Sequence, residues 1–117
     1  MHTEPKRPVN NHKAYHAHIY FDAETLALAE RLAAESGSRF GLQVGRIHQR
    51  LVGPHPCWSV QVIFSHKDFD GFINWLDEER QGLTVLVHAQ TGDDLKDHTD
   101  YAYWLGDSVP LKLDMFR

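Results

Sequence analysis

The chain has 117 residues, of which 42% are hydrophobic and 24% charged, and its formal net charge is −4. These values predict one globular domain with a modest core. They exclude nucleic acids and anionic membranes as expected partners, because phosphate binding needs a basic surface, and no apolar run reaches the roughly 20 residues that cross a bilayer. The single cysteine, Cys57, excludes an internal disulfide and makes the cytoplasm the expected location.

Residues 1–13 are polar and lack the apolar segment of a secretory signal, so we expect a flexible arm before a single domain at 14–117. Residues 14–21 alternate between an apolar face and a face with His16, His18 and Tyr20, which predicts a strand. Asp22 is expected to cap a helix that ends at Gly37. A less regular strand at 40–51 and a tight GPHP connection at 53–56 follow.

The second half of the chain repeats this order. Residues 58–64 alternate as a third strand, and Ser65 with Asp68 resembles a capping box. The following helix ends at Gly82, and its apolar residues have the spacing i, i+3, i+4 and i+7: Phe69, Phe72, Ile73 and Leu76. Residues 83–88 predict a fourth strand. A short helix within 97–105 and an edge strand containing Leu111, Leu113 and Met115 are expected in the remaining segment.

The order β-α-β-β-α-β predicts an α+β fold, the ferredoxin-like sandwich, with an antiparallel sheet, both helices on one face and a C-terminal extension. In this topology the first strand lies between the third and the fourth. His16, His18 and His88 are therefore expected to share the face without helices. His48, with Arg46 and Arg50, joins them if odd-numbered residues of 40–51 face the helices. Because Ile63 and Leu86 also lie on this face, we expect the C-terminal tail, a second copy or both to cover it, and we predict a homodimer.

The chain contains nine histidines, and histidine is the commonest metal ligand and suits acid–base chemistry near neutral pH. His55 is held stiffly between two prolines, which suits a ligand. His98, among aspartates 94, 97 and 100, is expected to belong to a solvated charged segment when taken alone. His2, His12 and His66 are expected at the surface. Imidazoles bind Zn, Cu, Ni and Fe(II), and non-haem Fe(II) sites often add a carboxylate. A three-histidine site is equally open, and the candidate carboxylates are Asp22, Asp93, Asp94 and Asp114.

Four strings occur in a specific order: YHAHIYFD, VGPHP, LVHAQTGDDLKDHTDYAYWLG and LKLDMF. Together they closely resemble the DOPA 4,5-dioxygenase family, from about Tyr15 to Phe116. One departure is Ala89, where many relatives have proline. The resemblance implies a non-haem Fe(II)-dependent extradiol dioxygenase, which opens the ring of a catechol such as L-DOPA with O₂. Zn or Ni can replace the iron in such proteins after purification.

By motif, the resemblance implies His18, His55 and His88 as metal ligands, with His16 and His98 as acid–base groups or outer partners of the ligands. The candidates for substrate binding are Tyr20, Arg50, Tyr101 and Trp104. Strand directions place His55 and His88 at opposite ends of the sheet, which leaves two alternatives open. One is a set of His16, His88 and His98, and the other is a site completed by a second subunit.

The sequence also leaves two rival functions open. One is a dimer that binds a metal or small molecule without turnover. The other is a cofactor-free monooxygenase or isomerase in which the histidines act only as acids and bases. A purely structural interaction domain would not account for the histidines.

Overall fold

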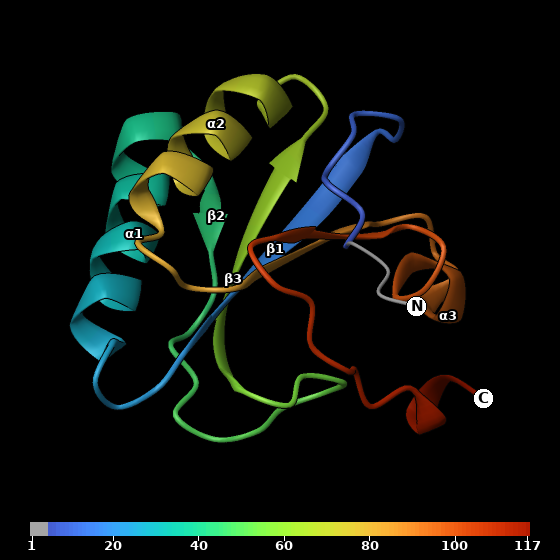
Figure 1. The fold of residues 1–117 in the computed structure, drawn as a ribbon. Helices are drawn as coiled ribbons and strands as arrows, with labels where there is room; N and C mark the ends of the chain where they lie inside the picture. The colour runs from blue at the N-terminus through green and yellow to red at the C-terminus, as the bar shows by residue number, and fades with distance from the viewer. Residues whose placement is uncertain (1–4) are drawn as a thin grey trace.

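The computed structural model describes residues 5–117, so the expected surface position of His2 lies outside the described residues. Figure 1 shows the elements in chain order, and their bounds are β1 (Ala14–Phe21), α1 (Leu26–Phe40), β2 (Gln43–Val44), β3 (Trp58–Ser65), α2 (Phe69–Glu79), β4 (Val85–Ala89), α3 (Asp94–Asp97), β5 (Ala102–Leu105) and a 3₁₀ turn (Asp114–Phe116). Within this range no helix has both the length and the apolarity to cross a membrane.

The sheet has five strands in the order β2-β3-β1-β4-β5, and every neighbouring pair is antiparallel. Helices α1 and α2 lie together on one side of it, whereas α3 and the C-terminal tail lie on the other (Figure 1). The predicted α+β sandwich with a C-terminal extension is therefore confirmed, with β5 as an additional edge strand.

The main core lies between the sheet and the two helices. The apolar halves of β1 and β3 meet the apolar stripe of α2, and Ile19, Val60, Val62, Phe72 and Leu76 have no exposed surface. Burial of each such side chain stabilises the fold by about 1.5–3 kcal/mol. The same alternation sends the intervening residues of β1 to the other face, where the histidines lie.

Helix α1 differs from the prediction at both ends. The Asp22 carboxylate accepts hydrogen bonds from the backbone N–H groups of Glu24 and Thr25 in a turn ahead of the helix, and Thr25 is the N-cap. Gly37 lies inside the helix. The stop is Gly41, whose φ of 66° is the left-handed conformation that glycine adopts without steric cost.

The second strand is much shorter than predicted. Only Gln43 and Val44 form β2, and an isolated bridge joins His48 to Ser59. Between Val44 and His48 the chain advances four residues, whereas the partner advances three from Val62 to Ser59. This extra residue acts as a bulge and reverses the alternation. As a result, Val44 and Ile47 both pack on the helix side, and His48 reaches the opposite face.

The C-terminal segment was predicted incorrectly. Instead of a helix within 97–105, the short α3 begins after Asp93, whose carboxylate caps it by accepting from the Lys96 N–H at 3.0 Å. Residues 102–105 form the edge strand, because Tyr103 and Leu105 pack toward the helices while Ala102 and Trp104 pack on the other side. Residues 111–115 form no strand.

Part of the predicted N-terminal arm lies along β5. The Lys6 carbonyl accepts from the Trp104 N–H at 2.8 Å, and Arg7 forms an ion pair with Asp77 at 2.8 Å. His12 is half-buried rather than at the surface, with its Nε2 3.3 Å from the Tyr103 hydroxyl. The flexibility of the arm stays a prediction.

Candidate metal centre

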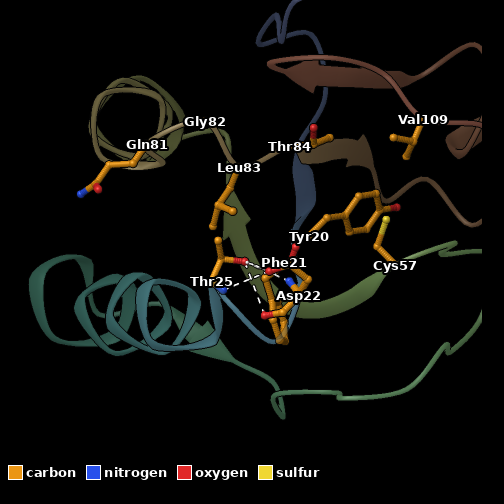
Figure 2. Close-up of a pocket in the computed structure, with 10 residues that line it drawn as sticks. All are labelled: Tyr20, Phe21, Asp22, Thr25, Cys57, Gln81, Gly82, Leu83, Thr84 and Val109. Atoms are coloured by element: carbon orange, nitrogen blue, oxygen red, sulfur yellow. Dashed lines mark hydrogen bonds between the residues drawn. The ribbon is translucent and has the colours of Figure 1, made fainter.

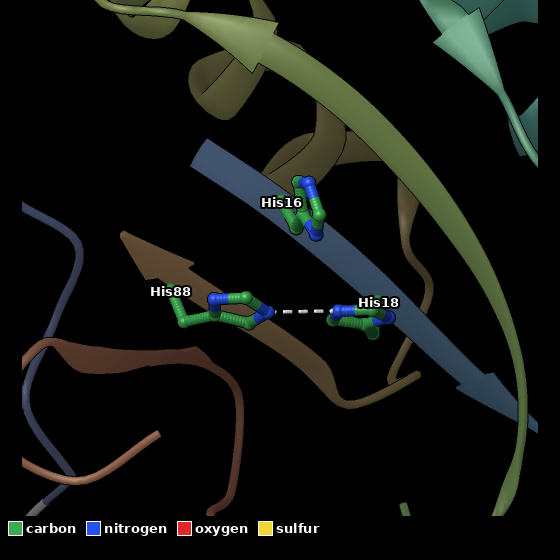
Figure 3. A group of neighbouring side chains, drawn as sticks. All are labelled: His16, His18 and His88. Carbon is green, nitrogen blue, oxygen red and sulfur yellow. Dashed lines mark hydrogen bonds between the residues drawn. The ribbon is translucent and has the colours of Figure 1, made fainter. Parts of the chain in front are cut away.

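Three histidines converge on the face of the sheet that α1 and α2 leave uncovered (Figure 3). Strand β1 contributes His16 and His18, and its neighbour β4 contributes His88, which pairs directly with His16. One side-chain nitrogen of each lies within 4.8 Å of the others. The Nε2 atoms of His18 and His88 are only 3.0 Å apart. Among the described residues, no carboxylate joins this group.

The hydrogen bonds at this site leave nitrogen lone pairs available to an ion. His88 Nδ1 donates to the Ala89 carbonyl at 2.8 Å, so its Nε2 carries a lone pair that points toward His18. Two nitrogens bound to one ion at about 2.1 Å, with an angle of about 90° between them, lie about 3.0 Å apart. The observed 3.0 Å separation therefore fits two imidazoles on one metal ion.

Two further histidines flank the group on either side. The His55 ring lies 4.1 Å from that of His18, and the His98 ring lies 4.2 Å from that of His88. The GPHP loop thus folds back over the sheet face, which strand directions alone do not predict. His18 lies between His55 and His88, but His55 is not part of the group of three nitrogens.

Hydrogen bonds orient both flanking rings. His55 Nδ1 is 2.7 Å from the Tyr20 hydroxyl, and both side chains are buried. His98 Nδ1 donates to the Asp94 carbonyl at 2.7 Å, which leaves its Nε2 free to accept a proton.

A cavity of about 300 Å³ lies over these histidines, large enough for a small aromatic molecule. The C-terminal tail forms part of its wall: Phe116 stacks on His98 at 4.7 Å, and the Lys112 N–H donates to the Pro54 carbonyl at 2.8 Å. The tail therefore supplies part of the cover that the apolar residues on this face require.

Burial favours the neutral form of four of these histidines. Desolvation lowers the pKa of His88 to about 3 and that of His55 to about 4, with neighbouring imidazoles as a smaller cause. Burial, followed by repulsion from His55 and His88, lowers the pKa of His18 well below its usual value. The pKa of His16 is also lowered, mainly by desolvation. Neutral imidazole is the form that binds metals, so the site is prepared for a cation at neutral pH.

The four residues expected to bind substrate lie in different surroundings and do not form one binding site. Tyr20 is close to the site but is engaged with His55. Trp104 packs with Leu86 in an apolar cluster beneath the tail. Tyr101 packs on the helix side of the sheet, and Arg50 is exposed and does not line the cavity.

Asp97 is a residue whose role the sequence pattern concealed. It was grouped with a solvated charged segment, yet only 1% of its surface is exposed. Its carboxylate accepts from the Thr91 N–H at 2.9 Å and from the Thr91 hydroxyl at 2.6 Å. It therefore fixes the loop between β4 and α3 to the end of α3, where His98 follows directly as the C-cap residue.

A larger cavity of about 420 Å³ lies at the other end of β1, between the β1–α1 turn and the start of β4 (Figure 2). Its polar groups Asp22 and Thr25 bond to each other, as the dashed lines in Figure 2 show. No histidine lines this cavity, so it is not a candidate metal site although it is larger than the cavity over the histidines.

Comparisons with known proteins show which family this chain resembles. The profile of the Dopa 4,5-dioxygenase family matches residues 15–115. A DOPA 4,5-dioxygenase from Amanita muscaria is 32% identical over 110 residues, which cover 86% of this chain and 48% of the relative. An uncharacterized 21.2 kDa protein from Botryotinia fuckeliana is 32% identical over 116 residues, covering 89% of this chain and 63% of the relative. The chain thus spans between about half and two thirds of the length of these relatives.

A solved structure is similar over nearly its whole length. The crystal structure of a candidate dioxygenase from Nostoc punctiforme superposes with a TM-score of 0.87 at 39% identity. The match covers 96% of this chain and 97% of the other.

Proposed function

Because this chain belongs to the Dopa 4,5-dioxygenase family, we propose that it is a non-haem Fe(II)-dependent extradiol dioxygenase that opens the ring of a catechol such as L-DOPA. The observation that carries the proposal is the group of three histidines, whose nitrogens lie within 4.8 Å of one another beneath a cavity. In the overall reaction both atoms of O₂ enter the product. The catechol supplies all the electrons, so no external reductant is consumed.

We assign His18, His88 and His16 as the metal ligands. The 3.0 Å separation of the His18 and His88 nitrogens supports the first two, and the common 4.8 Å limit supports the third. This assignment exchanges the roles that family motifs imply for His16 and His55. A site with His55 in place of His16 is the rival arrangement, and replacing each residue separately distinguishes the two.

An Fe(II) ion held there supplies the redox chemistry that lets O₂ react with a bound catechol. The chain provides binding, orientation and proton transfer. His98 lines the cavity with Nε2 free, and its Nδ1 bond to the Asp94 carbonyl fixes the ring, so it can accept a proton from a catechol hydroxyl. His55, oriented by Tyr20, offers a second acid–base group beside His18. Met115 and Phe116 of the tail form part of the cavity wall, where they can pack against a bound ring.

The proposed reaction can be tested on protein loaded anaerobically with Fe(II). L-DOPA or caffeic acid is added, air is admitted, and O₂ uptake and visible absorbance are recorded. We expect stoichiometric O₂ uptake and a yellow ring-opened semialdehyde, because cleavage next to the diol yields that chromophore. A colourless diacid would contradict the extradiol reaction, and turnover by chelator-treated protein would favour a cofactor-free oxygenase. No turnover with any simple catechol would refute the function.

The ligand assignment has a separate readout, the iron content after desalting. We expect His16→Ala, His18→Ala and His88→Ala to lose iron, whereas His55→Ala retains it. His66→Ala is the matched control, because His66 is exposed and outside the cavity. Iron loss in His55→Ala together with full retention in His16→Ala would replace our assignment with the rival one. Zinc or nickel in purified protein would not identify the native metal, since both bind nitrogen ligands more tightly than Fe²⁺.

We also propose that the protein is a homodimer in the cytoplasm. The partly covered sheet face supports self-association, and the single cysteine suits a reducing compartment. Size-exclusion chromatography with light scattering measures the mass of the protein in solution. The mass of one chain would contradict the dimer.

A further inference from the structure

We propose that Arg46 binds a carboxylate on the catechol side chain, so that the enzyme prefers catechol acids that lack an amino group. The inference rests on the proposed function and refines its substrate class. Its physical basis is a second cavity of about 200 Å³, here called the side cavity, which adjoins the cavity over the metal centre.

The two cavities share a wall. His18, His55, Gly53 and Gln61 line both of them. A molecule bound over the histidines of β1 and β4 can therefore extend past His18 without leaving the binding region. The side cavity continues over β3 and β2 to Arg46, which follows two residues after the end of β2.

The sheet itself gives the length of this path. Gln61 on β3 pairs with His18 on β1, and on its other side the Gln61 carbonyl accepts from the Gly45 N–H at 2.8 Å. His18, Gln61 and the segment beside Arg46 thus lie in one row across three strands. Two strand spacings amount to about 10 Å. This distance is comparable with the length of a catechol that carries a two- or three-carbon acid chain.

The charges in the side cavity select for an anion. Arg46 is exposed and makes no ion pair with any described residue, so its guanidinium is available. The lining contains no aspartate or glutamate. Arginine binds a carboxylate through two parallel hydrogen bonds, whereas an ammonium group would find no counter-charge here. L-DOPA carries both groups, so it matches this cavity less well than the corresponding acid without nitrogen.

The test compares two substrates with the same ring and a similar three-carbon chain, 3-(3,4-dihydroxyphenyl)propanoate and 4-propylcatechol. In the Fe(II)-loaded protein, Arg46→Gln is expected to lower kcat/KM for the acid about tenfold, mainly by raising KM, because one charge-assisted contact is lost. It should leave kcat/KM for 4-propylcatechol unchanged. The control is Lys67→Gln, which removes one positive charge from an exposed turn after β3 and should change neither value. The unmodified protein should turn over the acid more efficiently than L-DOPA.

Several results would overturn the inference. These are equal effects of Arg46→Gln on both substrates, no effect on either, or a preference for L-DOPA over the acid. If Arg50→Gln raised the KM for the acid and Arg46→Gln left that KM unchanged, the carboxylate site would lie at Arg50. This result would also overturn the inference.

Anaerobic calorimetry separates this inference from the proposed function. If no catechol is turned over, the proposed dioxygenase activity fails, but binding of the acid can still be measured. A dissociation constant for the acid that is about tenfold weaker in Arg46→Gln would support the carboxylate site. The same dissociation constant in both proteins would refute it.

Discussion

Replacing Asp97 with alanine is expected to destabilise the chain by about 3 kcal/mol. The carboxylate is buried and accepts two hydrogen bonds from Thr91, at 2.9 and 2.6 Å. A hydrogen bond to a charged group contributes roughly 1.5–3 kcal/mol, so the lower limit for two such bonds is about 3 kcal/mol. With an unfolding entropy of about 2.1 cal/mol/K per residue, 1 kcal/mol corresponds to about 4 °C for a chain of 117 residues. The expected decrease in Tm is therefore about 12 °C.

Thermal unfolding and urea titration of the metal-free protein measure this change. Asp97→Asn keeps the shape and one acceptor oxygen, and it should lose about half as much stability. Asp100→Ala is the matched control from the same segment, because Asp100 is exposed, and it should stay within about 0.5 kcal/mol of the unmodified protein. If Asp97→Ala cost less than about 1 kcal/mol, the carboxylate would not be holding the loop, and our account of how His98 is positioned would be wrong.

Two more predictions concern the buried histidines. Lowering the pH from 7 to 5 should destabilise the metal-free protein by about 2 kcal/mol for each of His88 and His55. Their folded pKa values of about 3 and about 4 lie below the usual 6.5, so the unfolded chain binds more protons in this window; an unchanged urea midpoint would contradict this. Tyr20→Phe should leave His55 Nδ1 without its partner, which should cost about 1–3 kcal/mol and lower kcat about 10- to 100-fold with iron retained. An unchanged kcat would show that His55 needs no orientation by Tyr20.

The parts of the fold that could be predicted are those with a complete local signal. Strand β1 alternates over eight residues, and α2 presents four buried apolar residues at helical spacing. By contrast, β2 has only two paired residues, and β5 only four. Their extended conformation depends on pairing with β3 and β4, which no local pattern specifies. The bulge after Val44 also depends on the partner strand, so the orientation of His48 could be expressed only as a condition.

The candidate site also combines features that a local sequence pattern predicts with features that it does not. Alternation along β1 and β4 placed His16, His18 and His88 on one face, and their convergence confirms that inference. The direction of the GPHP loop results from tertiary packing, so the sequence could not indicate it. The burial of Asp97 also depends on packing. One signal for Asp97 was present: a threonine six residues earlier in a loop containing Gly92, which can close a short turn around a carboxylate.

The arrangement of His18 and His88 is a costly one for a purely structural role. Both side chains are buried, and the Nε2 of each has that of the other as its hydrogen-bond partner at 3.0 Å. Burial of polar groups disfavours folding unless their hydrogen bonds are satisfied, and apolar residues at these positions would cost less. One proton between the two nitrogens satisfies this pair but leaves His16 nearby, with its own lowered pKa, without a role. A metal ion would replace that proton and could engage all three nitrogens together, which is why a bound cation would account for the cluster better than packing does.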